Sequence, residues 1–137
     1  MHDAELDIVR RLRDEIDTFL RPNIDAFARY LDLNEAFHSA VVDLAKSPML
    51  RRTLERVLSL PFASPSAAVF ARSKLPKAAE MIMLGHEHHH AIVEAIERRE
   101  GTRAESLGRE HARLSRRNLE VALADQTAWS CVPGASL

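Results

Sequence analysis

Histidine is concentrated in one short stretch of this chain. Four of the seven histidines lie within residues 86–90, in the segment GHEHHH, which runs directly into apolar residues at helical spacing. Neutral imidazole binds zinc, nickel, copper and iron, and it can also exchange a proton near neutral pH. The segment therefore has three interpretations from its composition: a metal site, a solvated helix face, or a remnant of a purification tag.

Helical geometry distinguishes these four histidines, because successive residues turn by about 100° around a helix. The apolar stripe of the helix expected over residues 86–100 consists of Ile92, Val93, Ala95 and Ile96. His89 lies near the middle of that stripe, one turn earlier. His86 and His88 fall toward its opposite edges, and His90 points mostly to solvent. One histidine of the four is therefore predicted to face the core.

Two further predicted helices repeat this feature. Asn34 and His38, spaced i and i+4, lie within the stripe formed by Phe27, Leu31 and Val41. On the last predicted helix, His111 is at the centre of the stripe and Asn118 follows it two turns later. Three helices are thus expected to direct one histidine each into a common core.

A buried histidine does not by itself indicate a metal. A single core histidine is more often satisfied by one hydrogen bond, whereas three together need partners for every ring nitrogen. Each unmet group costs about 1–3 kcal/mol, and one shared metal ion would remove that cost. From spacing alone, a metal site and a hydrogen-bonded core without metal both remain open.

The apolar spacing predicts an all-α fold. Helices are expected over residues 4–20, 23–45, 48–58, 66–84, 86–100 and 102–124. Ser47-Pro48 is typical of a helix start, and Pro76 should interrupt the fourth segment. Gly101 is expected to end the fifth helix, and Thr102 with Glu105 to form a capping box for the last. No strand alternation or glycine-rich phosphate loop is present.

These segments predict an antiparallel bundle of five to six helices. We expect one domain over residues 1–124 and an irregular tail over 125–137. The 137 residues are 46% hydrophobic and 28% charged, with a net charge of −1, so no basic surface for nucleic acid or an anionic membrane is expected. The single Cys131, the absence of a signal peptide and the absence of a long apolar run predict a cytoplasmic protein.

Three motifs, in order, resemble a known family. They are Asn34-Glu-Ala-Phe37-His38, then His89-His-Ala-Ile92-Val-Glu-Ala95-Ile96, then Glu110-His111. Together they resemble the FadR C-terminal (FCD) domain, the all-helical effector-sensing domain of GntR-type bacterial transcription regulators, over about residues 5–124. The resemblance implies that His38, His89 and His111 are metal ligands beneath a cavity for a small organic acid, whose carboxylate completes the coordination.

The chain departs from the family pattern at three points. Asn34 stands where the family has an aspartate, and His88 stands where glutamate is common. No winged helix-turn-helix precedes the predicted bundle in this chain, so contact with DNA is expected only through a winged-helix domain that this chain lacks. An asparagine oxygen is neutral and a weaker ligand, which should favour an anionic effector at an open position.

We therefore predict a regulatory sensor domain rather than an enzyme. Its cofactor is a divalent metal, with zinc as first choice and nickel or manganese as alternatives, held by His38, His89, His111 and Asn34. Its partner is a small carboxylate effector, for which the candidate contacts are Asn118, His86 and Arg72, and a homodimer is an expected assembly. No membrane contact is expected.

Two other functions remain open from the sequence. One is a small helical metallohydrolase, although no carboxylate is predicted on the inward faces beside the histidines to act as a general base. The other is a metal-free bundle, structural or sensory, whose inward histidines are hydrogen-bonded.

Overall fold

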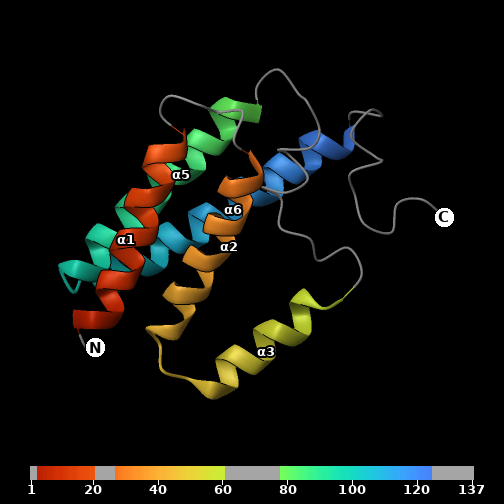
Figure 1. Cartoon of the computed structure of the whole chain (residues 1–137). Coiled ribbons are helices and arrows are strands. Elements are labelled where there is room, and N and C mark those ends of the chain that lie inside the picture. The colour runs from red at the N-terminus through yellow and green to blue at the C-terminus, as the bar shows by residue number, and fades with distance from the viewer. Residues whose placement is uncertain (1–2, 21–26, 61–77, 125–137) are drawn as a thin grey trace.

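The helices follow from apolar residues recurring every three or four positions. The computed structural model describes residues 3–20, 27–60 and 78–124, and within these ranges the chain is all-α with no strand (Figure 1). The described helices are α1 (Asp3–Leu20), α2 (Phe27–Asp43), α3 (Pro48–Leu58), α5 (Ala78–Glu97) and α6 (Gly101–Ala124). The predicted fold class is confirmed.

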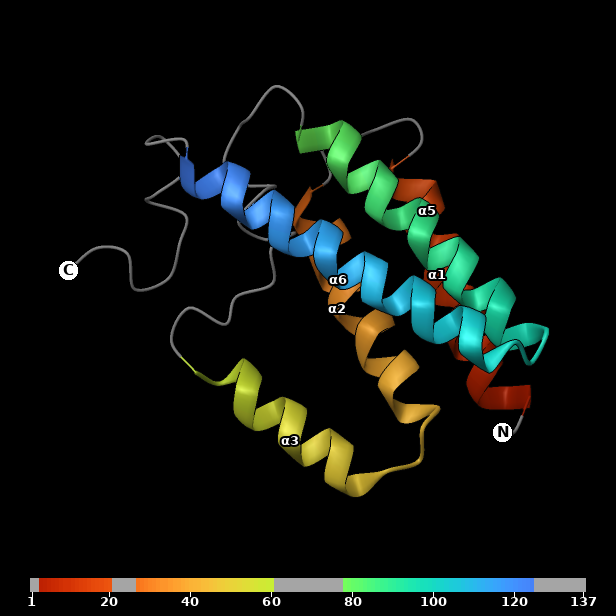
Figure 2. The same ribbon diagram turned by 180° about the vertical axis from the view of Figure 1, so that it is seen from behind.

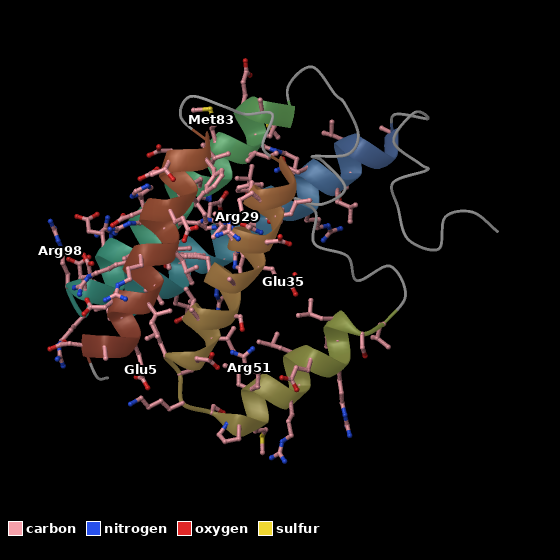
Figure 3. The ribbon with its side chains drawn as sticks, in the orientation of Figure 1. Glu5, Arg29, Glu35, Arg51, Met83 and Arg98 are labelled. Atoms are coloured by element: carbon pink, nitrogen blue, oxygen red, sulfur yellow. The ribbon has the colours of Figure 1, made fainter. Side chains whose placement is uncertain are left out.

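The bundle consists of two antiparallel pairs of helices, joined through α1 and α5. The first helix packs against α2 and α5, and α5 packs in turn against α6. Figure 2 shows α6 returning along α5 at an angle after a short turn. The short α3 contacts only α2 among the described helices. Figure 3 shows Arg51 between these two helices, where its guanidinium donates to Ser39 and pairs with Asp43.

The core lies between α1, α2 and α5. Its central buried cluster is formed by Val9, Ile16, Leu20, Tyr30, Leu33, Phe37, Ile82 and Val93. Apolar spacing places Ile8 on the stripe of the helix predicted over residues 4–20 and Val121 on that of the last helix, and both predictions are wrong, because Ile8 is 52% exposed and Val121 is 46% exposed. Ile8 lies between the buried Leu6 and Val9, on the side of α1 that faces away from the core, and Val121 lies in the last turn of α6.

One predicted helix terminus is confirmed, and two others, the end of α5 and the start of α6, differ from prediction. Ser47 is confirmed as an N-cap, because its hydroxyl accepts the Leu50 N–H at 3.2 Å. The predicted stop at Gly101 is wrong, since α5 ends at Glu97 and Arg99 takes the left-handed conformation with φ of 58°. The N–H of Arg99 then bonds the carbonyl of Ile96, and that of Glu100 bonds the carbonyl of Ala95, which is the Schellman pattern.

The turn between α5 and α6 therefore comes earlier in the chain than predicted, at Arg99 rather than at Gly101. Gly101 is the first residue of α6, and the carbonyl of Thr102 accepts a bond from the Ser106 hydroxyl inside that helix. Thr102 is thus not an N-cap, and the predicted capping box does not form. The last helix does extend to Ala124 as predicted.

The GHEHHH segment lies in the middle of a longer helix than expected. The break predicted between residues 84 and 86 is absent, because α5 is continuous from Ala78 to Glu97. The remainder of the helix predicted over 66–84, including Pro76, and the tail predicted over 125–137 lie outside the described residues. Among the described helices, none is both long and apolar enough to span a bilayer.

Candidate metal centre

Three helices bring three histidines together. His38 comes from α2, His89 from α5 and His111 from α6, and one ring nitrogen of each lies within 4.8 Å of the others. The ring centroids are 4.9 Å apart for His38 and His89, 5.2 Å for His38 and His111, and 4.7 Å for His89 and His111. The convergence predicted from helical spacing is therefore present.

Local sequence explains how each imidazole is positioned. His89 is 1% exposed and lies one turn before the buried Ile92 and Val93, so the core stripe of α5 continues into it. His111 lies three residues before the buried Leu114 in the same way. On α2, Phe37 packs its ring against His89 at 4.4 Å between centroids, and His38 follows directly.

Burial keeps these three imidazoles neutral near pH 7. Burial lowers the pKa of His38, and it lowers that of His89 well below the ordinary value, helped by the charges of His38 and His111. The pKa of His111 falls to about 4 through burial and then the charges of His38 and His88. Neutral imidazole is the form that ligates a metal.

The donor set fits a divalent transition metal. The Nε2 atoms of His89 and His111 lie 3.3 Å apart. The Nδ1 atom of His111 is buried and has no hydrogen-bond partner among residues 3–20, 27–60 and 78–124. Three neutral imidazoles with incomplete hydrogen bonding suit zinc, nickel or copper better than a hard cation.

Asn34 is buried beside this region, and its carbonyl oxygen already has a partner. The Tyr30 hydroxyl, one turn earlier on α2, donates to Asn34 Oδ1 at 3.3 Å. Burial raises the pKa of Tyr30, so the phenol stays a neutral donor. Direct ligation by Asn34 stays a prediction, and one lone pair of that oxygen is left for it.

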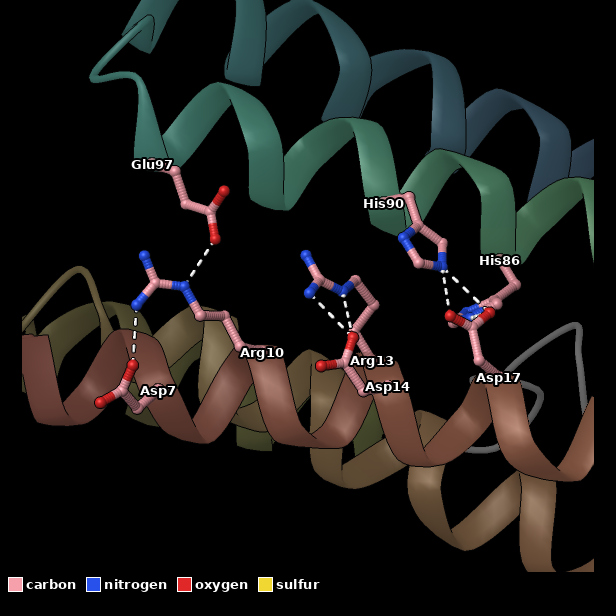
Figure 4. A network of polar contacts seen from close by, with 8 residues as sticks. All are labelled: Asp7, Arg10, Arg13, Asp14, Asp17, His86, His90 and Glu97. Carbon is pink, nitrogen blue, oxygen red and sulfur yellow. Dashed lines mark hydrogen bonds and ion pairs between the residues drawn. The ribbon is translucent and has the colours of Figure 1, made fainter.

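The sequence did not predict a second group of side chains, in which a carboxylate meets two histidines. Asp17 of α1 lies 3.0 Å from His86 Nε2 and 3.0 Å from His90 Nε2 (Figure 4). These three side chains also bring ligand atoms within 4.8 Å of one another. Asp17 contacts His86 and His90 rather than His38, His89 or His111, so this carboxylate belongs to a separate group of side chains.

The position of His86 also differs from prediction. It is 2% exposed rather than at the rim, because α1 covers the edge of α5 that helical geometry alone leaves open. His90 is half-buried against the same carboxylate rather than directed to solvent. A sequence signal did exist: Asp17 follows the buried Ile16 and precedes Leu20 by three residues, so it borders the buried stripe of α1.

The Asp17 carboxylate is held in its ionised form. Burial acts to raise the pKa of Asp17. The hydrogen bond and charge of His90 and the charge of His86 together lower it by more, so the net shift of the pKa is downward. Burial lowers the pKa of His86, with Asp17 opposing the shift. The side-chain group of Asp17, His86 and His90 thus joins α1 to α5 next to the three-histidine cluster.

Of the two remaining predicted site residues, the structure describes Asn118 but not Arg72. Asn118 is buried on α6, two turns after His111, and its Oδ1 atom has no hydrogen-bond partner in the described part of the chain. Arg72 lies outside the described residues. The surface hollow lined by Met49, Arg52 and Arg56 belongs to α3 and includes none of the histidines. An effector cavity beside the histidine cluster stays a prediction.

The described part of the chain is thus an all-α bundle in which three helices, α2, α5 and α6, each direct one histidine to a common point. The model of the FCD domain family matches residues 1–114, so the chain belongs to that family, the effector-binding domains of GntR-family regulators. The match contains His38, His89 and His111, and Asn118 lies beyond it. FCD domains are regulatory rather than catalytic. A search of curated proteins finds no match.

Proposed function

We propose that this chain is the sensor part of a GntR-type bacterial transcription regulator. It binds one divalent metal through His38, His89 and His111 and a small organic acid next to that metal. The convergence of three neutral imidazoles from three different helices, one of them buried and two partly buried, carries this proposal.

The hydrogen-bond inventory supports a metal. When His89 and His111 are neutral, their two Nε2 atoms at 3.3 Å can share only one proton. His111 Nδ1 has no partner among the described residues, so whichever tautomer it adopts, buried hydrogen-bonding capacity is left unused. A coordinated cation would use these lone pairs, and three imidazole nitrogens favour zinc or nickel over manganese.

The charge of the site supports an anionic effector. Three neutral histidines and the neutral Asn34 leave the charge of a divalent cation uncompensated, and a cation held there supplies an open position for a carboxylate oxygen. The side-chain amide of Asn118 can donate to such an acid. His86 has both ring nitrogens engaged, with His89 and Asp17, so we assign it no effector contact.

Asp17 does not turn the site into that of a hydrolase. Its carboxylate contacts His86 and His90, and it approaches the three-histidine cluster only through the His86 ring. A general base must reach the proton that it removes, directly or through one water molecule. The sensor function is therefore the one that the arrangement of these groups favours.

Metal binding is tested on protein prepared without an affinity tag. We expect one equivalent of zinc per chain, and a melting temperature that rises on the order of 10 °C when free zinc is about 100 times the dissociation constant. A chelator should reverse the rise. Calorimetric titration and thermal melts measure both quantities. Protein that takes up no zinc, and melts identically with zinc or chelator, would contradict the metal.

Effector binding is tested by introducing a negative charge at Asn118. Asn118→Asp should weaken the binding of small mono- and dicarboxylates to the zinc-loaded chain by about tenfold or more, because two anions would meet in a buried site. Ala112→Asp is the matched control, since it adds the same charge to an exposed position of α6. Equal weakening by both variants, or no binding of any acid to the wild-type chain, would count against the effector assignment.

A further inference from the structure

Hydrogen-bonding distances link Asp17 to the metal centre through two imidazole rings. Asp17 Oδ1 lies 3.0 Å from His86 Nε2, and His86 Nδ1 lies 3.3 Å from His89 Nδ1. On the far side of the His89 ring, Nε2 faces His111 Nε2 at 3.3 Å. Figure 4 shows the outer end of this series, where Asp17 on α1 meets His86 and His90 on α5.

The number of protons in this series decides which atom of His89 can bind a metal. Two neutral imidazoles share one proton between their facing Nδ1 atoms. If His89 Nδ1 carries it, His89 Nε2 has a free lone pair, and His86 must carry its own proton on Nε2. That proton points at the Asp17 carboxylate, so every contact in the series pairs a donor with an acceptor.

The opposite arrangement is unfavourable. If His86 Nδ1 carries the shared proton, the lone pair of His86 Nε2 faces a carboxylate oxygen at 3.0 Å, and two acceptors are opposed. His89 Nε2 then carries a proton and is lost as a ligand. The ionised carboxylate of Asp17 therefore selects the first arrangement.

We propose that Asp17 and His86 are positioning residues for the metal centre, which hold His89 in the tautomer whose Nε2 lone pair faces His38 and His111. This inference rests on the proposed metal-binding function. Hydrogen-bonding partners of a metal-bound histidine fix its tautomer and orientation, and losing one costs about 10–100-fold in metal affinity.

The same count of protons means that only one of the two candidate metal-binding groups can hold a cation at a time. A cation on His86 Nε2, in the group of Asp17, His86 and His90, would place the shared proton on His86 Nδ1. His89 Nε2 would then be protonated and unable to complete the three-histidine group. The chain therefore binds one metal ion, and Asp17 serves as a hydrogen-bond acceptor while that ion is bound.

Nitrogen-15 NMR of the histidine rings in the metal-free wild-type chain tests the tautomer directly. We expect the proton of His89 on Nδ1 and that of His86 on Nε2. The reverse assignment would overturn the proposal. This measurement needs no variant and no metal, so it decides the matter even if the wild-type chain binds no zinc, a result that would contradict the proposed function instead.

Zinc titration of Asp17→Asn tests the consequence for affinity. The substitution keeps the shape but replaces the anionic acceptor of the His86 proton by a neutral amide that can donate or accept. The tautomer preference is then lost, the His89 ring is a weaker and less well-oriented ligand, and zinc affinity should fall about 10–100-fold. Asp14→Asn is the matched control, because it removes the same charge from a more exposed position of α1 that pairs with Arg13. The control should shift affinity by less than about threefold.

Two results of that titration would contradict the inference. One is an equal change in Asp17→Asn and Asp14→Asn, which would mean that charge alone matters. The other is tight binding of two zinc ions by the wild-type chain, which the shared proton forbids. A weakened Asp17→Asn with mixed His89 tautomers by NMR would support it, since a merely structural effect would leave the tautomer unchanged.

Discussion

Replacing His89 with alanine is expected to lower the zinc affinity of the chain by at least about 100-fold. The substitution removes one of three nitrogen ligands, and loss of an outer hydrogen-bonding partner alone costs about 10–100-fold. His89 is the most deeply buried of the three histidines, at the point where α5 meets both α2 and α6. Calorimetric titration with zinc at constant pH measures the change.

The adjacent His88 provides the matched control. It lies on the same helix, is half-buried and is near His111, with 5.7 Å between ring centroids, yet it does not belong to the converging group. His88→Ala should leave zinc affinity within about threefold of wild type. Because His89→Ala opens a cavity in the core, His38→Ala repeats the test at a less buried ligand. Wild-type affinity in both ligand variants would refute the site.

The three converging histidines could be predicted because their orientation is a local property. Each lies three or four residues from apolar residues of its own helix, and those residues face the core whatever packs against them. His86 could not be placed in this way. The burial of His86 depends on α1, whose Asp17 contacts it from 69 positions away in the sequence. The spacing of apolar residues along α5 contains no information about that contact.

The turn between α5 and α6 shows a second limit of sequence reasoning. A glycine after a helix commonly takes the left-handed conformation, and Gly101 was the natural choice for it. The chain instead places Arg99 there, at the steric cost of a side chain, and satisfies two carbonyls of α5 by doing so. Tertiary packing of α6 against α5 outweighs the local preference of one residue.

Acid is expected to destabilise the metal-free chain between pH 6.5 and about 4. His111 protonates at 6.5 in the unfolded chain but only at about 4 in the fold, because burial and the charges of His38 and His88 oppose it. The unfolded state therefore binds more protons in this window, and stability present above pH 6.5 is lost as pH falls. His111 alone accounts for up to roughly 3 kcal/mol, and the lowered pKa values of His38, His86 and His89 act in the same direction.

Urea unfolding at a series of pH values, with a chelator present, measures this loss. Asp17 acts in a separate window, because its pKa is lowered from 3.8 and its contribution is lost only below that value. His111→Gln should weaken the dependence above pH 4, since glutamine does not titrate and only His38, His86 and His89 still contribute, while His88→Ala should keep most of it. Zinc competes with protons for the same nitrogens, so the stabilisation by zinc should be largest near pH 7 and fade toward pH 4. A free energy of unfolding that stays constant from pH 6.5 to 4 would show that these imidazoles are not buried as neutral groups.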